Sequence, residues 1–265
     1  MEARLSKARQ RLGLVLRNTG PIFTVADVAD VLGIERVDAS KILSRWATQG
    51  WVVRLRRGIY AAVPLESSGG DVVFENPWVI VPSLFETAYI GGWSAAEHWD
   101  LTEQIFSSIC VLTAGNIRRK HHTIGGTRFV LSSMRGDRHF GTRFEWVGNQ
   151  RVAVSDPEKT IIDMFHKPSI GGGIQHATEC FRNLVRASQG ETDKLVEYAQ
   201  RFASGAVNKR LGLIGEALGL NEFARSLFAG KSAGNVQLDP KNPGDRLITR
   251  WGTWVPPHWE RWAHE

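Results

Sequence analysis

A single glycine between two helical patterns is the feature that most restricts how this chain folds. Apolar residues recur at helical spacing over residues 25–32, directly after Thr24, which opens a sequence with capping-box spacing. Gly33 ends this pattern, and glycine adopts the left-handed backbone of a tight turn more easily than any other residue. We expect the next helix to begin at Asp38 as its N-cap and to run to about Gln49. Two helices with so short a connection predict a helix-turn-helix.

The flanking segments complete a winged helix. Apolar residues at helical spacing predict a first helix within residues 5–16. Residues 51–63 have the apolar, β-branched and aromatic character of two strands, and Arg56 and Arg57 stand between these strands. We therefore predict that residues 1–64 form an N-terminal winged helix-turn-helix domain with an arginine-rich hairpin as its wing.

The excess positive charge of the chain lies in this segment. Residues 1–64 contain 11 Lys and Arg against 5 Asp and Glu, which accounts for the whole net charge of +6. A small basic module on a neutral body favours a polyanionic partner, because neutralising phosphates releases condensed counterions. A basic surface that only serves solubility gives the same count, so the charge alone leaves both interpretations open.

The outward face of the third helix has the chemistry of a DNA-reading surface. Ala39, Leu43 and Trp46 belong to its inward apolar stripe. Its outward positions hold short hydroxyls and long cations, with no acid among them. Such residues permit close approach and reach phosphates or guanine edges. The predicted DNA-contacting residues of this helix and of the wing are Arg36, Ser40, Lys41, Ser44, Arg45, Thr48, Arg54, Arg56 and Arg57. Because helix-turn-helix folds also bind proteins, a protein-binding or merely solvated face is the alternative.

A run of proline, glycine and serine predicts where this domain ends. The run begins at Pro64 and indicates an interdomain linker over residues 65–75. In the remainder, residues 76–265, strand-like patterns come first and helical patterns follow. We therefore expect an α+β chain: a winged helix-turn-helix domain, then a larger α+β domain with a small mixed sheet followed by a helical bundle.

The search for catalytic residues in the larger domain favours structural roles. Asp156, Glu158 and Asp163 offer carboxylates to a metal-dependent nuclease, but they fall within two helical turns, whereas such enzymes gather carboxylates from separate elements. Helix capping and a solvated helix face are therefore favoured for them. Ser94, in a weak nucleophile-elbow sequence, is better explained as a helix cap. No catalytic residue, metal ligand or cofactor is predicted, and we do not expect an enzyme.

Cysteine spacing and hydropathy bear on the compartment. Cys110 and Cys180 are far apart and have no metal-ligand spacing around them, which excludes a disulfide framework and favours a reducing cytoplasm. No run of about eighteen uncharged apolar residues occurs, and no apolar segment follows the charged N-terminus. The sequence therefore predicts a cytoplasmic protein without membrane contact.

Two further segments each keep two interpretations. The basic run at residues 118–122 either adds a second phosphate contact or is a solvated turn. Four tryptophans, Trp251, Trp254, Trp259 and Trp262, stand close together in the sequence. Core anchors of a terminal strand are favoured for them over an exposed patch for a partner.

Three motifs in combination resemble the AbiEi antitoxins of type IV toxin-antitoxin systems. These motifs are Arg56-Arg57-Gly58-Ile59-Tyr60, Gly92-Trp93-Ser94-Ala95-Ala96-Glu97-His98 and Asp156-Pro157-Glu158-Lys159-Thr160-Ile161-Ile162-Asp163. The resemblance covers about residues 5–200 and implies a bacterial cytoplasmic phage-defence protein. It implies that the N-terminal domain binds inverted repeats in its own promoter and represses the operon, while the larger domain counteracts a nucleotidyltransferase toxin. The Gly-Ser dipeptide of that toxin's motif is absent, so the chain resembles the antitoxin.

The expected partners follow from the module and from the resemblance. They are double-stranded operator DNA with inverted repeats and a nucleotidyltransferase toxin. A homodimer on DNA is also expected, because small DNA-binding modules gain affinity by doubling. Two alternatives remain: a winged-helix regulator that responds to a small ligand, and a metal-dependent nucleic-acid enzyme that uses Asp156, Glu158 and Asp163.

Overall fold

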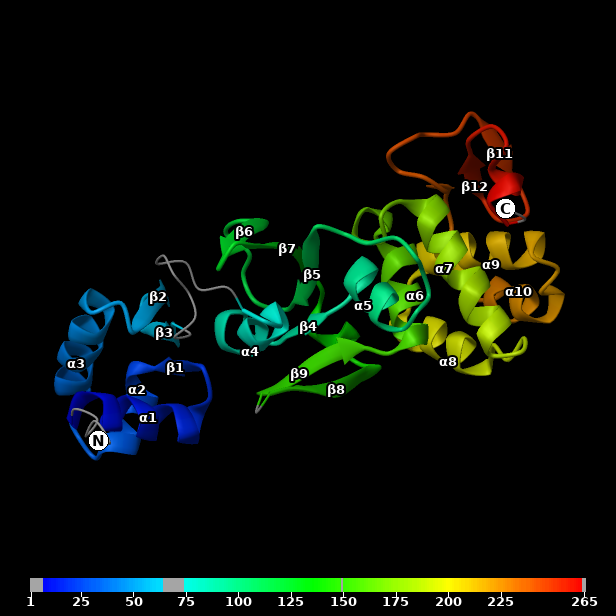
Figure 1. Cartoon of the computed structure of the whole chain (residues 1–265). Coiled ribbons are helices and arrows are strands. Elements are labelled where there is room, and N and C mark those ends of the chain that lie inside the picture. Colours follow the sequence, from blue (N-terminus) through cyan, green and yellow to red (C-terminus); the bar gives the residue numbers. More distant parts are fainter. Residues whose placement is uncertain (1–6, 64–73, 149, 264–265) are drawn as a thin grey trace.

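The computed structural model describes residues 7–63, 74–148 and 150–263 of the chain (Figure 1). It is a mixed α+β protein, as the sequence predicts. We call residues 7–63 the N-terminal module and residues 74–263 the body. The predicted linker lies almost entirely outside the described residues, so the domain boundaries stay a prediction. Along the molecule, the module is followed by a central sheet and then by a layer of helices (Figure 1).

The N-terminal module has the element order of a winged helix. Its elements are α1 (Lys7–Thr19), β1 (Ile22–Thr24), α2 (Val25–Leu32), α3 (Arg36–Thr48), β2 (Val52–Arg56) and β3 (Ile59–Ala62). The strands form an antiparallel sheet in the order β1-β3-β2. Buried Val15, Phe23, Val28, Leu43 and Trp46 join the three helices to this sheet in one hydrophobic cluster. The short strand β1 carries no pattern that the sequence analysis recognised.

The turn between α2 and α3 is built largely as predicted. The Thr24 hydroxyl accepts from the Asp27 amide at 3.1 Å, and the Asp27 carboxylate accepts from the Thr24 amide at 2.7 Å, which makes a complete capping box. Gly33 has a φ of 61° and ends α2 in the left-handed conformation. The prediction of Asp38 as N-cap is wrong: α3 begins at Arg36, so Asp38 lies in its first turn. An acid there still favours the helix dipole.

The body begins with a six-stranded mixed sheet. Its strands are β4 (Ala88–Ile90), β5 (Ser108–Thr113), β6 (His121–Ile124), β7 (Thr127–Ser133), β8 (Thr142–Val147) and β9 (Gln150–Ser155). They are ordered β6-β7-β5-β4-β9-β8, with β5–β7 and β4–β9 parallel and the other pairs antiparallel. The 3₁₀ turn η1 (Pro77–Ile80) and α4 (Val81–Leu84) pack on one face. Helices α5 (Gly92–His98) and α6 (Pro157–His166) pack on the other.

Helices fill the second half of the body. They are α6, α7 (Ile174–Ala187), α8 (Asp193–Phe202), α9 (Gly205–Ala217) and α10 (Asn221–Phe228), with 3₁₀ turns η3 (Pro168–Ile170) and η4 (Trp259–Ala263). A further 3₁₀ turn, η2 (Gly136–Arg138), lies between β7 and β8. A small sheet of β10 (Val236–Gln237), β11 (Arg246–Ile248) and β12 (Thr253–Val255) follows them. None of the helices within the described ranges is long and apolar enough to cross a membrane.

The tryptophans near the end anchor this last sheet to the helices. Trp251 and Trp259 are buried, whereas Trp254 and Trp262 are half-buried. The ring of Trp251 covers Gly212 of α9, where any side chain would collide with it. Its indole nitrogen donates to Glu216 at 2.5 Å. The interpretation as core anchors is therefore confirmed for Trp251 and Trp259, and Trp262 packs against the same core cluster.

Ser94 does not cap a helix. Helix α5 begins at Gly92, so Ser94 lies within it and is buried. Its hydroxyl accepts a hydrogen bond from the Cys110 amide of β5 at 2.9 Å. Ser94 thus ties α5 to the central sheet, and the capping prediction is wrong because the helix starts one turn earlier than the sequence spacing indicates.

Candidate nucleic-acid interface

The outward face of α3 is open to solvent. Lys41, Ser44, Arg45 and Thr48 are exposed, and Ser40 is half-buried. The inward stripe of Ala39, Leu43 and Trp46 is buried on α2 and on the sheet, so packing fixes which face points outward. Arg36 is also exposed, in the first turn of the helix. The predicted reading face therefore does not pack against the body.

Two residues change the chemistry of this face from the prediction. Asp38 is exposed in the first turn and pairs with Lys41 at 2.9 Å, so the outward side of the helix is not free of acids. Their side chains are 58% and 71% exposed, and such surface pairs contribute only about 0.2–1 kcal/mol, so Lys41 exchanges partners readily. Val37 is 64% exposed one turn before Lys41. The sequence analysis missed Val37, whose apolar side chain suits contact with a thymine methyl group.

The wing presents its arginines unequally. Arg54, Arg56 and Arg57 are all exposed around the β2–β3 turn, where Gly58 has a φ of 82°. The Arg54 Nε donates to the carbonyl oxygen of Arg56 at 3.4 Å. The Arg56 Nη1 donates to the carbonyl oxygen of Leu84 in α4 at 2.7 Å. Arg54 and Arg57 are thus the more available wing cations, while Arg56 also holds the wing to the body.

A shared hydrophobic cluster fixes the module on the body. Ile22, Ile59 and Ala61 of the module sheet belong to the same cluster as Val79 and Ile80 of η1. At a second point, the Gln150 side-chain amide donates to the carbonyl oxygen of Thr19 at 3.1 Å. The reading face of α3 and the wing are therefore held in a defined orientation to the central sheet.

The basic run beyond the wing lies across a groove from Arg56. A cavity of about 510 Å³ is lined by Arg56 on the module side and by Arg118, Arg119 and His122 on the body side. The run is not one loop, because His121 and His122 already belong to the edge strand β6. Its position adjoining the wing places cations of the body next to the predicted DNA-contacting surface.

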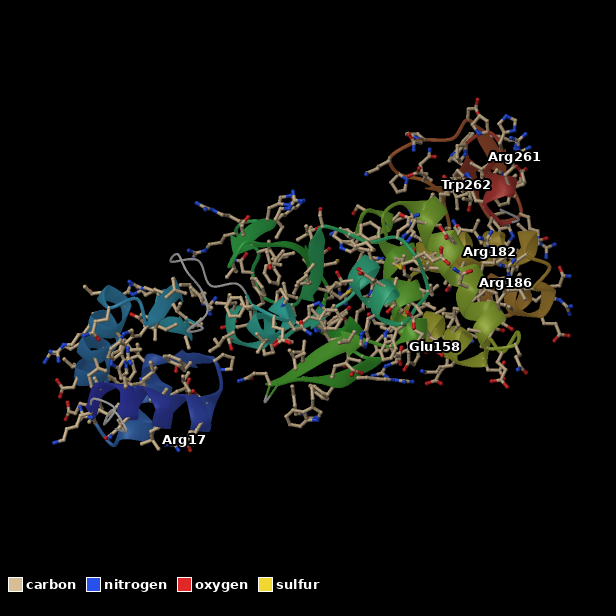
Figure 2. All side chains as sticks on the ribbon, in the orientation of Figure 1. Arg17, Glu158, Arg182, Arg186, Arg261 and Trp262 are labelled. Carbon is tan, nitrogen blue, oxygen red and sulfur yellow. The ribbon has the colours of Figure 1, made fainter. Side chains whose placement is uncertain are left out.

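The carboxylates of α6 face protein donors, not a metal site. Asp156 caps the helix by accepting from the Lys159 amide at 2.9 Å, and it also accepts from the Tyr198 hydroxyl at 2.9 Å. Lys194 pairs with Asp156 at 3.1 Å and with Glu158 at 2.7 Å. Glu158 lies on the body far from the reading face (Figure 2). Within the residues that the structure describes, no three His, Cys, Asp or Glu side chains gather around a common point.

Part of the predicted solvated face of α6 is buried, and that prediction is wrong. Lys159 and Asp163 have no exposed side-chain surface and form an ion pair one turn apart. The Lys159 ammonium donates to the Tyr89 hydroxyl at 3.0 Å, and this hydroxyl donates to Asp163 at 2.9 Å. Burial raises the pKa of Asp163 and lowers the pKa of Lys159, while each charge favours the other. The rings of Phe140 and Phe202 lie 5.3 and 5.4 Å from the ammonium and enclose it.

A winged helix-turn-helix with an exposed cationic reading face defines a class of DNA-binding regulators. Residues 10–63 match the family model described as "Transcriptional regulator, AbiEi antitoxin". The resemblance to AbiEi antitoxins is thereby confirmed for the N-terminal module, and the matched class is one of regulators, not enzymes.

The fold of the whole chain is similar to that of a solved structure. The RV2827C protein from Mycobacterium tuberculosis matches with a TM-score of 0.65 over 96% of this chain and 93% of that chain. The two sequences are 14% identical, so the likeness concerns the fold alone. No curated protein sequence matches the chain.

Proposed function

We propose that this protein is a transcriptional autorepressor and antitoxin of a type IV toxin-antitoxin system. Its module binds inverted repeats in its own promoter, with two copies on the operator, and its body counteracts a nucleotidyltransferase toxin. The observation that carries the proposal is the open cationic face of α3 inside the segment that matches the AbiEi family model. The buried stripe of α3 against the module core leaves only that face for a duplex.

Docking of α3 in a major groove explains the distribution of charge. Arg36 and Val37 at the start of the helix point toward base edges in such a pose, because recognition helices contact bases with their first turns. Arg54 and Arg57 of the wing then lie beside the flanking phosphates. Footprinting of the protein on the DNA upstream of its own gene tests the repressor part. Protection of an inverted repeat is expected, and no protection at low salt would contradict it.

The antitoxin part has its own test. Co-expression of a neighbouring nucleotidyltransferase with the full chain is expected to restore growth that the nucleotidyltransferase alone arrests. A variant with alanine at Lys41 and Arg45 should still restore growth, because the proposed toxin-directed activity lies in the body. Continued arrest with the wild-type chain would contradict the antitoxin proposal and would leave the DNA-binding proposal standing.

Replacing both Arg118 and Arg119 with alanine is expected to weaken binding to the operator and to unrelated DNA alike. Each lost phosphate contact reduces the slope of log affinity against log salt by about one unit, so a decrease of about two units is expected. Fluorescence anisotropy over a salt series measures the slope. Arg186 on α7 (Figure 2) and Arg225 on α10 provide a matched double-alanine control. An unchanged slope would mean that Arg118 and Arg119 are solvated and make no phosphate contact.

A further inference from the structure

Strand β8 is a free edge of the six-stranded sheet. It pairs with β9 on one side, and no other strand in the described parts of the chain pairs with its other side (Figure 1). Its six residues stay in continuous register with β9 from Thr142 to Val147, without a bulge. The opposite edge, β6, has only four residues and follows a run of cations, two features that protect an edge from pairing. β8 has no proline, bulge or run of cations.

The hairpin geometry shows which backbone groups of β8 face outward. The β8–β9 turn closes on the pair Val147 and Gln150 with two residues between them. In a two-residue hairpin, the closing pair exchanges both hydrogen bonds, and bonded pairs then recur at every second residue. The amides and carbonyls of Val147, Glu145 and Arg143 therefore point to β9. Those of Thr142, Phe144 and Trp146 point away from β9, toward the open edge.

The side chains along this edge include two solvent-exposed aromatic residues. Phe144 is 56% exposed and Trp146 is 67% exposed, and both lie on one face of the strand. The Arg151 guanidinium of β9 lies 4.1 Å from the Phe144 ring and 5.8 Å from the Trp146 ring. Large apolar residues gathered on an exposed strand edge are typical of an interaction surface.

The opposite face of β8 carries two opposite charges. Arg143 lies over the Trp99 ring at 5.4 Å, and Glu145 lies 3.8 Å from His98. Arg143 is exposed and the Glu145 side chain is 36% exposed, so both remain accessible from the edge. The two charges stand one residue on either side of Phe144.

This order of residues makes the edge complementary to itself. An antiparallel pair of β8 strands centred on Phe144 places Arg143 of each copy opposite Glu145 of the other, twice by symmetry. In this register the outward amide and carbonyl of Phe144 in one copy face those of Phe144 in the other copy, so the two residues can exchange both backbone hydrogen bonds. Registers centred on Arg143 or on Glu145 place like charges directly opposite, which is unfavourable. Only the first of these three registers matches both the charges and the hydrogen bonds.

We propose that β8 is the surface through which a second copy of this chain binds, so that two six-stranded sheets continue into one. This pairing rests on the proposed function, in which the second copy occupies the other half of an inverted repeat. The occupant is a copy of the same chain because the edge offers equal numbers of opposite charges in a mirrored order around Phe144.

Sedimentation of the full chain without DNA, over a range of concentrations, tests the pairing. A reversible dimer is expected for the wild type. Arg143→Glu places glutamate opposite Glu145 at two points, and Glu145→Arg places arginine opposite Arg143. Each change is expected to raise the dimer Kd by about tenfold or more. The variant with both changes exchanges the charges and is expected to return to within about threefold of the wild-type Kd. Arg186→Glu on α7 is the control for added negative charge.

Two outcomes would overturn the pairing. One is a wild-type chain that stays monomeric at all concentrations. The other is a dimer whose Kd is unchanged by Arg143→Glu and by Glu145→Arg, both verified as folded by their unfolding transitions. Binding of the same variants to a single half-site separates this result from the proposed function. If the wild type binds the half-site but forms no dimer, the β8 pairing alone is rejected. If the wild type does not bind the half-site, DNA binding is rejected.

Discussion

Alanine at both Lys41 and Arg45 is expected to lower the affinity for the operator by about 30-fold to 1000-fold. Both side chains project from the exposed face of α3, and neither contributes to the buried core of the module. Loss of one specific cation contact costs about 1–3 kcal/mol, and two contacts in the lower half of this range give roughly 2–4 kcal/mol in total. Anisotropy with labelled operator DNA at fixed salt measures the change, and thermal unfolding verifies that the module still folds.

The control for this prediction removes the same charge elsewhere. Arg186 and Arg225 are exposed on helices of the body, away from the module, and their double-alanine variant should bind the operator nearly as the wild type does. Asp38→Ala provides a second comparison, because it frees Lys41 from its 2.9 Å ion pair and removes a negative charge from the face. It should strengthen binding slightly. Equal weakening by both double variants would mean that only net charge matters.

Lys159→Met is expected to lower the free energy of unfolding by about 3–5 kcal/mol. The change leaves the Asp163 carboxylate with no exposed surface and without its cationic partner, and removal of one partner from a buried pair has a cost of this size. The Tyr89 hydroxyl remains as a donor to Asp163 at 2.9 Å and compensates only in part. Urea unfolding at constant temperature measures the loss.

The pH dependence of this loss has a defined sign. Burial already raises the pKa of Asp163 in the folded chain, and the Lys159 charge opposes that rise. Without Lys159, the folded-state pKa rises further above the unfolded value, so the folded form gains a proton more readily than the unfolded form. The difference from the wild type is therefore greatest above the folded-state pKa of Asp163 in the variant, and it decreases as the pH falls through that pKa.

A double variant separates the ion pair from simple packing. Lys159→Met together with Asp163→Leu removes both charges, and apolar replacement of a whole buried pair is often neutral or stabilising. The double variant should therefore regain most of the stability lost by Lys159→Met alone. If the double variant is as unstable as the single one, the loss comes from packing around Tyr89, Phe140 and Phe202 and not from the unpaired carboxylate.

Local sequence signals were sufficient to predict which face of α3 is exposed. The capping box at Thr24, the left-handed Gly33 and the inward stripe of α3 all depend on residues within a few positions of one another. The exposed positions of Lys41 and Arg45 follow directly from helical periodicity. The predicted start of α3 is too late, because the side chain of Asp38 suits an N-cap, whereas the helix already begins at Arg36.

The features that the sequence did not reveal depend on distant partners. Strand β1 has three residues, and it exists because β3 pairs with it across more than thirty positions. Asp163 and Lys159 look solvated from their charge alone, since such residues are rarely buried unless paired. Their burial depends on Tyr89, Phe140 and Phe202, which come from three other segments.

The contact between wing and body also lay outside sequence reasoning. A proline- and glycine-rich segment indicates a tether, and it gives no sign that the two flanking parts touch. The structure shows instead that Ile22, Ile59 and Ala61 share a cluster with η1 and that Arg56 donates to the Leu84 carbonyl. Part of the wing thus attaches the module to the body.

That attachment fixes the orientation of the N-terminal module relative to the body. In a regulator whose DNA-binding domain is joined by a flexible linker, this domain samples many orientations before two copies bind both halves of a palindrome. Fixing the domain on DNA then costs conformational entropy. Here the hydrophobic cluster around Ile59 fixes the angle between the module and the body during folding. Under the proposed function, the spacing of the operator half-sites would therefore depend on the body as much as on α3.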